Sequence, residues 1–408
     1  MPGAQIAASP SASFLEISRM QDALAEEGLD AWLLYDFRGS NPIAADLTGV
    51  LRQGGHLATR RWFYLIPATG EPRGLVHAIE SQTLAHLPGH TRRYAGREQL
   101  KSELKTLLDG VHRIAMEYSP ECAIPYVSRV DAGTLELVRA CGSGIEVVSS
   151  GDLIQRFSST WGDEEIASHQ AASEKLHRIK DRAFEEVARA LRDDGSTTEY
   201  AIQQSMVRWF AEEGLISDAP PNVSATRNAG NPHYLPTAGA FSRIGDGDLV
   251  LLDLWGKLEQ PGAVYADITW MGYTGTNIPA RFNDAFAAIR DARDAAVRLV
   301  QTAIRSGRNL RGWEVDRAAS TVLRERGYGD RILHRTGHSL GQEVHGNGVN
   351  MDDYETHDDR RLLPGAGFTI EPGVYFPDFG ERTEINMIVR AADAVVSGPL
   401  QAEILALV

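Results

Sequence analysis

Two pairs of carboxylates stand inside apolar stretches in the second half of the chain, at spacings that predict hairpins. Asp253 interrupts the apolar run 248–255, and Asp267 interrupts the run 264–273. A Pro-Gly turn signal lies close to the midpoint between them, and residues equidistant from a turn face each other across an antiparallel ladder. The spacing therefore predicts that Asp253 and Asp267 are cross-strand neighbours.

A second pair repeats this geometry near the end of the chain. Glu371 lies in the apolar stretch 368–376 and Glu384 in the stretch 382–389, with the turn sequence Pro-Asp-Phe-Gly between them. Like charges across a ladder repel, and burying them unpaired is costly. A lone acid in a strand is explained by a salt bridge or an edge position, but two opposed pairs favour a bound cation.

A histidine motif separates the two hairpins. His334, His338 and His345 follow one another at spacings of four and seven, with Gly337 and Gly341 between them. Any one of them could be a core residue, but together they indicate loop backbone that presents side chains to a site. One imidazole with four carboxylates suits two divalent ions such as manganese, with cobalt, zinc or iron as alternatives. The nitrogen ligand makes calcium a poor fit.

The surrounding elements predict two domains after a flexible N-terminus at 1–13. Residues 14–155 alternate short strands with helices, which indicates a compact α/β domain for packing or dimerisation. No Gly-x-Gly-x-x-Gly fingerprint follows a strand there. Residues 156–408 alternate helices with hairpins, and Ser196 with Glu199 is expected to form a capping box at one helix start. This domain is predicted to be α+β, with helices on one face of an antiparallel sheet.

Composition excludes several classes of protein. The chain has 408 residues, is 43% hydrophobic and 24% charged, and carries a net charge of −14. Its acidity argues against nucleic acid and anionic membranes as partners, and no apolar run approaches the ~20 residues of a membrane span. The first residues lack the pattern of a signal peptide. With only two cysteines, the expected location is the reducing cytoplasm.

These motifs resemble those of the pita-bread metallopeptidases, which include aminopeptidase P, prolidase, methionine aminopeptidase and the metal-free creatinase. The resemblance covers the whole chain, including a creatinase-type α/β N-terminal domain, and is sharpest from 231 to 384. The contexts that carry it are DLVLLD, YADITW, RTGHSLG, TIEPGVY and RTE. The resemblance implies a pita-bread fold and five metal ligands: Asp253, Asp267, His338, Glu371 and Glu384.

The resemblance also implies hydrolysis of Xaa-Pro peptide bonds in short peptides, two divalent metal ions and a homodimer. Glu371 is the expected general base, and His345 and His233 are expected to act beside the scissile amide. Arg382 is expected to hold a carboxylate ligand or the substrate. The residues expected to contact substrate are His233, His334, His345, Arg360, Tyr375 and Arg382.

Substrate class is the least constrained inference. Arg360 or Arg361 could bind the carboxylate of a dipeptide, which favours prolidase over aminopeptidase P, although a solvated surface position is an equal alternative for these arginines. The segment 349–361 differs from the patterns of both enzymes. The alternatives are hydrolysis or lysis of a non-peptide metabolite on the same scaffold, and a metal-binding protein without catalysis.

Overall fold

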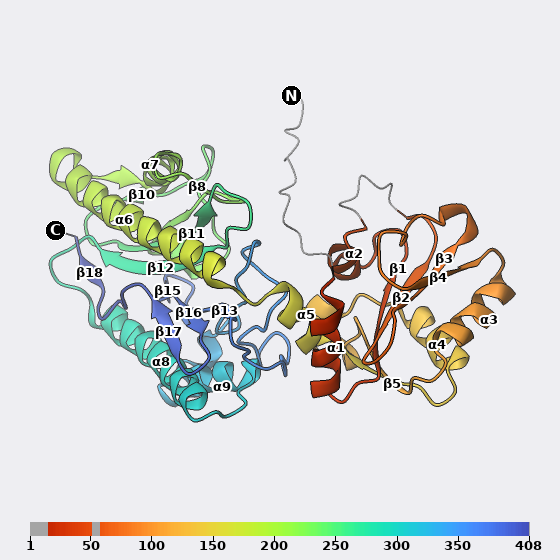
Figure 1. Ribbon diagram of the computed structural model, residues 1–408. Coiled ribbons are helices and arrows are strands. Elements are labelled where there is room, and N and C mark those ends of the chain that lie inside the picture. Colours follow the sequence, from red (N-terminus) through yellow and green to blue (C-terminus); the bar gives the residue numbers. More distant parts are fainter. Residues whose placement is uncertain (1–14, 51–57, 408) are drawn as a thin grey trace. The chain divides into compact units, whose positions relative to one another are not determined.

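The computed structural model describes residues 15–50 and 58–407. The segment 1–13, expected to be flexible, lies outside this range. The chain divides into two compact units, Met1–Ser158 and Ser159–Val408, drawn from red to yellow and from yellow to blue in Figure 1. None of the described helices is long and apolar enough to cross a membrane.

The first unit is built on a six-stranded mixed sheet. Its strands lie in the order β4-β3-β2-β1-β5-β6. The strands are β1 (Ala31–Asp36), β2 (Trp62–Pro67), β3 (Arg73–His77), β4 (His90–Tyr94), β5 (Arg113–Met116) and β6 (Glu146–Ser149). The helices are α1 (Ile17–Glu26), α2 (Pro42–Thr48), α3 (Arg97–Leu107), α4 (Ala132–Cys141) and α5 (Gly151–Ser158).

Alternation along β1 creates two cores in this unit. Trp32 and Leu34 pack in a cluster with α1, α2 and α5, whereas Leu33 and Tyr35 pack in another with α3 and α4. Successive side chains of a strand point to opposite faces, so helices cover both faces of the sheet. This arrangement confirms the expected α/β domain.

The second unit contains four helices that surround the hairpins. They are α6 (Asp163–Asp194), α7 (Glu199–Glu212), α8 (Ala280–Arg305) and α9 (Gly312–Glu325). Figure 1 shows α6 lying across β11 (Leu249–Leu258) and β12 (Ala266–Tyr273), and α8 lying below the strands from β15 (Gly380–Arg382) to β17 (Ala394–Ser397). Gly195 ends α6 with a φ of 73°, a conformation that glycine adopts without strain.

The α7 start differs from the expected capping box. Thr198 caps the helix, and its hydroxyl accepts from the N–H of Ala201. The Glu199 carboxylate instead accepts from the N–H groups of Ala225 and Ser242, each at 2.6 Å. A buried carboxylate gains more from such donors than from one helix terminus. Glu199 therefore fastens the long connection between β9 and β11 to α7.

The strands of the second unit form several small sheets. The first hairpin, β11 (Leu249–Leu258) with β12 (Ala266–Tyr273), is extended by β8 (Leu215–Ile216), β9 (Asn222–Ala225) and β18 (Leu405–Ala406). The second hairpin contains β13 (Gly367–Ile370), β14 (Gly373–Tyr375), β15 (Gly380–Arg382) and β16 (Ile385–Val389), with β17 (Ala394–Ser397) beside β16. A short pair joins β7 (Thr197–Thr198) to β10 (Arg243–Ile244).

The two faces of the first hairpin belong to different cores. Val250 and Leu252 pack with α6 and α7, whereas Leu249 and Leu251 pack with α8, α9 and the second hairpin. Asp253 lies on the same face as Leu249 and Leu251, because residues two apart on a strand share a face. The fold therefore directs the acids of the first hairpin toward the second hairpin.

Candidate metal centre

The first pair of acids lies on one hairpin but not in directly opposed positions. The register of β11 and β12 sets Asp253 opposite Thr269 and Trp255 opposite Asp267. The expected direct pairing is wrong by two residues, because the register is centred on Pro261, one residue later than the spacing predicts. A shift of two residues keeps both acids on one face, as diagonal neighbours within reach of each other.

The second pair of acids lies at a break between two short ladders. β13 pairs with β16 and β14 with β15, and one register runs through both ladders. That register sets Glu371 against Glu384 in the break, as their spacing predicts. There the N–H of Glu371 donates to the carbonyl of Thr336 at 2.7 Å, and the N–H of Glu384 donates to that of Thr269 at 3.1 Å. The break thus fastens the hairpin to the histidine segment and to β12.

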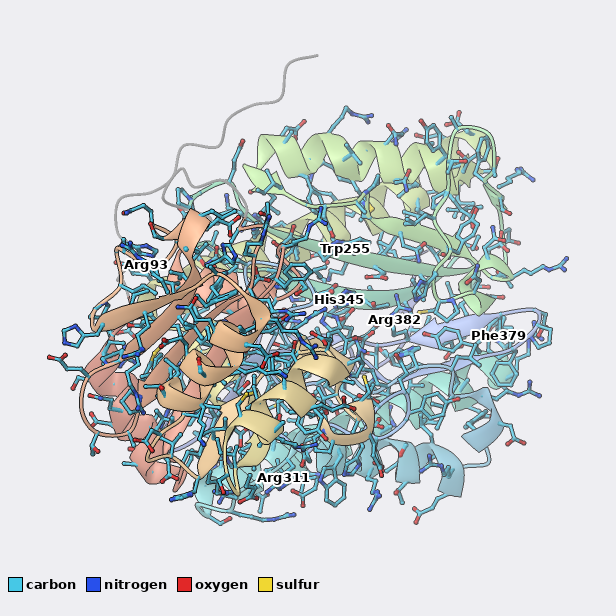
Figure 2. All side chains as sticks on the ribbon, turned by 90° about the vertical axis from the view of Figure 1, so that its right-hand side faces the viewer. Arg93, Trp255, Arg311, His345, Phe379 and Arg382 are labelled. Atoms are coloured by element: carbon cyan, nitrogen blue, oxygen red, sulfur yellow. The ribbon has the colours of Figure 1, made fainter. Side chains whose placement is uncertain are left out.

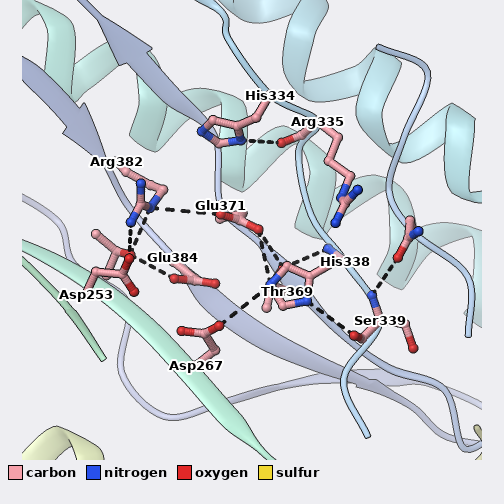
Figure 3. Close-up of polar contacts among 12 residues, drawn as sticks. Asp253, Asp267, His334, Arg335, His338, Ser339, Thr369, Glu371, Arg382 and Glu384 are labelled. Carbon is pink, nitrogen blue, oxygen red and sulfur yellow. Dashed lines mark hydrogen bonds and ion pairs between the residues drawn. The ribbon is translucent and has the colours of Figure 1, made fainter. Parts of the chain in front are cut away.

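The histidine segment runs beside β13. The His338 N–H donates to Thr369 Oγ1 at 2.9 Å, and the Thr369 N–H donates to the His338 carbonyl at 2.9 Å. A Cβ on Gly337 would lie 2.0 Å from the Thr369 carbonyl oxygen, so this approach requires glycine. As a result, His338 Nε2 lies 3.4 Å from Glu371 Oε1 and 3.6 Å from Asp267 Oδ2 (Figure 3).

Three of these side chains form a group that could hold an ion. Asp267, His338 and Glu384 each offer a ligand atom, and these atoms lie within 4.8 Å of one another. Asp267 Oδ1 and Glu384 Oε1 are buried without a hydrogen-bond partner among the described residues. Burial and then the neighbouring acids raise the pKa of both carboxyls well above the ordinary range. A divalent cation would remove this penalty.

Arg382 supplies positive charge at the other end of the group. Its guanidinium pairs with Asp253 (Figure 3) and donates to the hydroxyls of Thr269 at 3.0 Å and Tyr375 at 3.1 Å. The Tyr375 hydroxyl lies 2.7 Å from His334 Nε2. Of the two roles expected for Arg382, the structure shows contact with an acid of the predicted ligand set.

Comparison with known proteins identifies the family. A model described as metallopeptidase family M24 matches residues 171–396, which include both hairpins and the histidine segment. This chain belongs to metallopeptidase family M24. Membership implies the use of divalent metal, and the unpartnered carboxylate oxygens fit that requirement.

Relatives of this M24 family member include two named dipeptidases. The probable dipeptidase PepE of Mycobacterium tuberculosis is 28% identical over 254 residues, and the match covers 62% of each protein. The Xaa-Pro dipeptidase of Lactobacillus delbrueckii subsp. lactis is 29% identical over 206 residues, covering 50% of this chain and 51% of the relative. The chain therefore spans less than two thirds of these relatives.

The solved structures show the fold. Dipeptidase PepE from Mycobacterium ulcerans superposes with a TM-score of 0.65 and 22% identity, covering 96% of both chains. The expected pita-bread fold, preceded by a smaller α/β unit, is confirmed.

The fold brings some further predicted residues to the acids. The His345 ring packs edge-on against that of His338, with centroids 4.3 Å apart, and Figure 2 labels His345 beside Arg382 in the view. His334 is connected to Arg382 through the Tyr375 hydroxyl, which contacts both side chains. These contacts come from the histidine segment and the second hairpin, where the sequence predicts them.

Two other predicted residues have different surroundings. His233 is exposed, and its backbone N–H donates to Asn231. Arg360 is not solvated: it is 3% exposed and its guanidinium bonds to Asp358 and to the Asn347 carbonyl. The solvated surface position expected for Arg360 is therefore wrong, whereas its binding of a substrate carboxylate stays a prediction.

Two residues of the site were missing from the sequence-based prediction. Thr269 donates its hydroxyl to Glu384 Oε2 at 2.8 Å. The Asn386 amide accepts from the Asp267 N–H at 3.0 Å and donates to the Asp267 carbonyl at 2.5 Å. Each lies two positions after a predicted ligand, and residues two apart on a strand share a face. That spacing is the signal that could have found them.

Proposed function

We propose that this M24 peptidase is an Xaa-Pro dipeptidase that uses two divalent metal ions, with Mn²⁺ as the preferred metal. The observation that carries the proposal is the meeting of Asp267, His338 and Glu384 with unpartnered carboxylate oxygens. Glu371 lies beside His338 of this group, and Arg382 contacts both Glu371 and Asp253. Four carboxylates with one imidazole are sufficient to hold two ions.

These five residues would hold the metals, which when bound supply Lewis acidity toward the scissile carbonyl and the attacking water. Asp253 is ion-paired with Arg382 in the present structure. Arg382 would therefore have to share this carboxylate with an ion. Thr269 and Asn386 would fix the orientation of the ligands, in the way that hydrogen-bonded neighbours orient metal ligands generally.

Glu371 is the proposed general base. Burial by itself would raise its pKa, but the charges of His338, His334 and Arg382 outweigh burial and lower the pKa of this carboxyl. The carboxylate is therefore ionised at neutral pH and able to accept the proton of the attacking water. It would then return that proton to the proline nitrogen as the amide bond breaks.

His345 is proposed to bind the scissile carbonyl oxygen. Desolvation, together with the nearby His338 and Arg335, lowers the pKa of His345 to about 4. Its imidazole is thus neutral at pH 7 and carries one N–H that can donate to the developing oxyanion. Tyr375 and His334 are the proposed walls of the proline pocket, and both are held by hydrogen bonds.

The two relatives described above favour a dipeptidase, although others are named putative Xaa-Pro aminopeptidases. One relative is an Xaa-Pro dipeptidase and another a probable dipeptidase. The pairing of Arg360 with Asp358 weakens the argument based on that arginine. The preference for dipeptides therefore rests on relatedness, and it needs a direct assay.

The test compares Ala-Pro, Ala-Pro-Ala and Ala-Ala as substrates of chelator-treated enzyme with and without added Mn²⁺. We expect cleavage of Ala-Pro only, and only with metal. Cleavage of the tripeptide would change the assignment to an Xaa-Pro aminopeptidase. If Mn²⁺ binds but no prolyl peptide is cut, the substrate is a different metabolite and the proposal is wrong.

A further inference from the structure

An acidic side chain lies at the edge of the candidate centre without belonging to its ligand set. Asp218 is exposed in the connection between β8 and β9, and its Oδ1 accepts from Trp255 Nε1 at 2.6 Å. The Tyr265 hydroxyl also engages the backbone of Asp218. Among the described residues, no hydrogen bond or ion pair is made by the second carboxylate oxygen. Asp218 is thus held in position with one oxygen available.

Trp255 connects Asp218 to the acids of the centre. It stands directly opposite Asp267 in the β11–β12 ladder, and cross-strand partners share a face. Its indole therefore starts beside Asp267 and reaches Asp218 with its far, polar end.

The charges around Asp218 favour a cation. Burial is the main cause of the shifted pKa values of His345 and Asp267. The negative charge of Asp218 raises both pKa values. Lys257, two residues after Trp255 on β11, donates to the Gln342 carbonyl at 2.6 Å. An available carboxylate oxygen next to an indole is a setting that attracts an ammonium or guanidinium group.

We propose that Asp218 and Trp255 bind the side chain of the residue before proline and select lysine or arginine there. This inference rests on the proposed Xaa-Pro peptidase function. The α-ammonium of the peptide is attached to the carbon next to the scissile carbonyl, whereas the lysine ammonium ends a four-carbon stem. Because an indole separates Asp218 from Asp267, the longer group is the one that reaches Asp218.

The test uses Lys-Pro and norleucyl-Pro, which have similar stems but differ in charge. With Mn²⁺, we expect kcat/KM for Lys-Pro to exceed that for norleucyl-Pro by about five- to tenfold, mainly through KM. Asp218→Asn keeps the acceptor for Trp255 and removes the charge. It should abolish the preference for Lys-Pro by raising KM for Lys-Pro much more than KM for norleucyl-Pro. Asp193→Asn, at the exposed end of α6, is the control for a general change in net charge and should retain the preference.

Each other outcome has a distinct meaning. Equal rates on the two dipeptides, or a lysine preference that survives in Asp218→Asn, would overturn the inference and leave the peptidase assignment intact. A similar loss on both dipeptides in Asp218→Asn would mean that Asp218 binds the α-ammonium, which also overturns the side-chain assignment. If the native enzyme cleaves neither these dipeptides nor Ala-Pro, the proposed function itself fails.

Discussion

Two glutamates of the second hairpin show how strongly placement decides the chemistry of one residue type. Glu371 lies in the break between the ladders, and its pKa is lowered by neighbouring positive groups that outweigh burial. Glu381 lies on β15, is fully buried, and has no hydrogen-bond partner for either oxygen among the described residues. Burial raises the pKa of Glu381 well above its usual range.

Substitution of Glu371 tests its proposed role in catalysis. Glu371→Gln removes the proposed base and weakens a metal ligand, so we expect kcat for Ala-Pro to fall by at least about 100-fold. Glu381→Gln is the matched control, since it makes the same change in the same hairpin at a position outside the acid group. Unchanged turnover in Glu371→Gln would contradict the assignment of the base.

Buried Glu381 makes the stability of the protein depend on pH. Unfolded Glu381 ionises near the ordinary glutamate pKa, whereas the folded protein keeps its proton to higher pH. The free energy of unfolding therefore falls as pH rises above about 4.5. Glu381→Gln removes this loss and should stabilise the protein by about 1–3 kcal/mol at pH 8, with a smaller effect at pH 5. Urea denaturation at both pH values measures the difference, and a gain that is equal at both would refute this account.

At the level of elements, two side-chain amides from the last part of the chain fasten β12. Asn386 on β16 bonds to both backbone groups of Asp267 on β12, and Gln401 bonds in the same way to both backbone groups of Met271. The two amides therefore fix β12 at two points. Only the first of these points carries a predicted metal ligand.

This pair of amides provides a matched experiment. Asn386→Leu removes both bonds to Asp267, and we expect Mn²⁺ affinity to fall roughly 10- to 100-fold, as for other residues that orient ligands. Gln401→Leu removes the equivalent bonds at Met271 and should lower stability without changing Mn²⁺ affinity. Titration calorimetry measures the affinities, and equal losses in the two variants would indicate a general structural effect.

The elements also show which features are readable from sequence. The register of the second hairpin follows from the spacing of Glu371 and Glu384, because the turn is tight and its sequence is specific. The register of the first hairpin differs from the expected one by two residues, because the connection before β12 is long and its centre is ambiguous. The bonds of Asn386 and the burial of Arg360 depend on contacts between distant segments. The two-residue spacing of Asn386 from Glu384 predicts that they share a face, but local patterns do not identify the distant partners of these residues.

At the scale of the whole molecule, metal binding should be coupled to stability. A ligand that binds only the folded state stabilises it by about 2.7 kcal/mol when its concentration is 100 times its Kd. We therefore expect Mn²⁺ to raise the melting temperature of the chelator-treated protein by several degrees. Glu384→Gln should reduce this rise, and an equal response in that variant would place the ion elsewhere.

The joining of the two hairpins also has a consequence for how the protein is made. Arg382 and Asp253, which form an ion pair, are 129 positions apart in the chain. Contacts of such long range close late in folding, since the intervening chain must first become ordered. During synthesis, β16 leaves the ribosome well after β11 and β12. Loading of the metal is therefore expected to wait until β16 has been made, and chains truncated before β16 should be unable to acquire it.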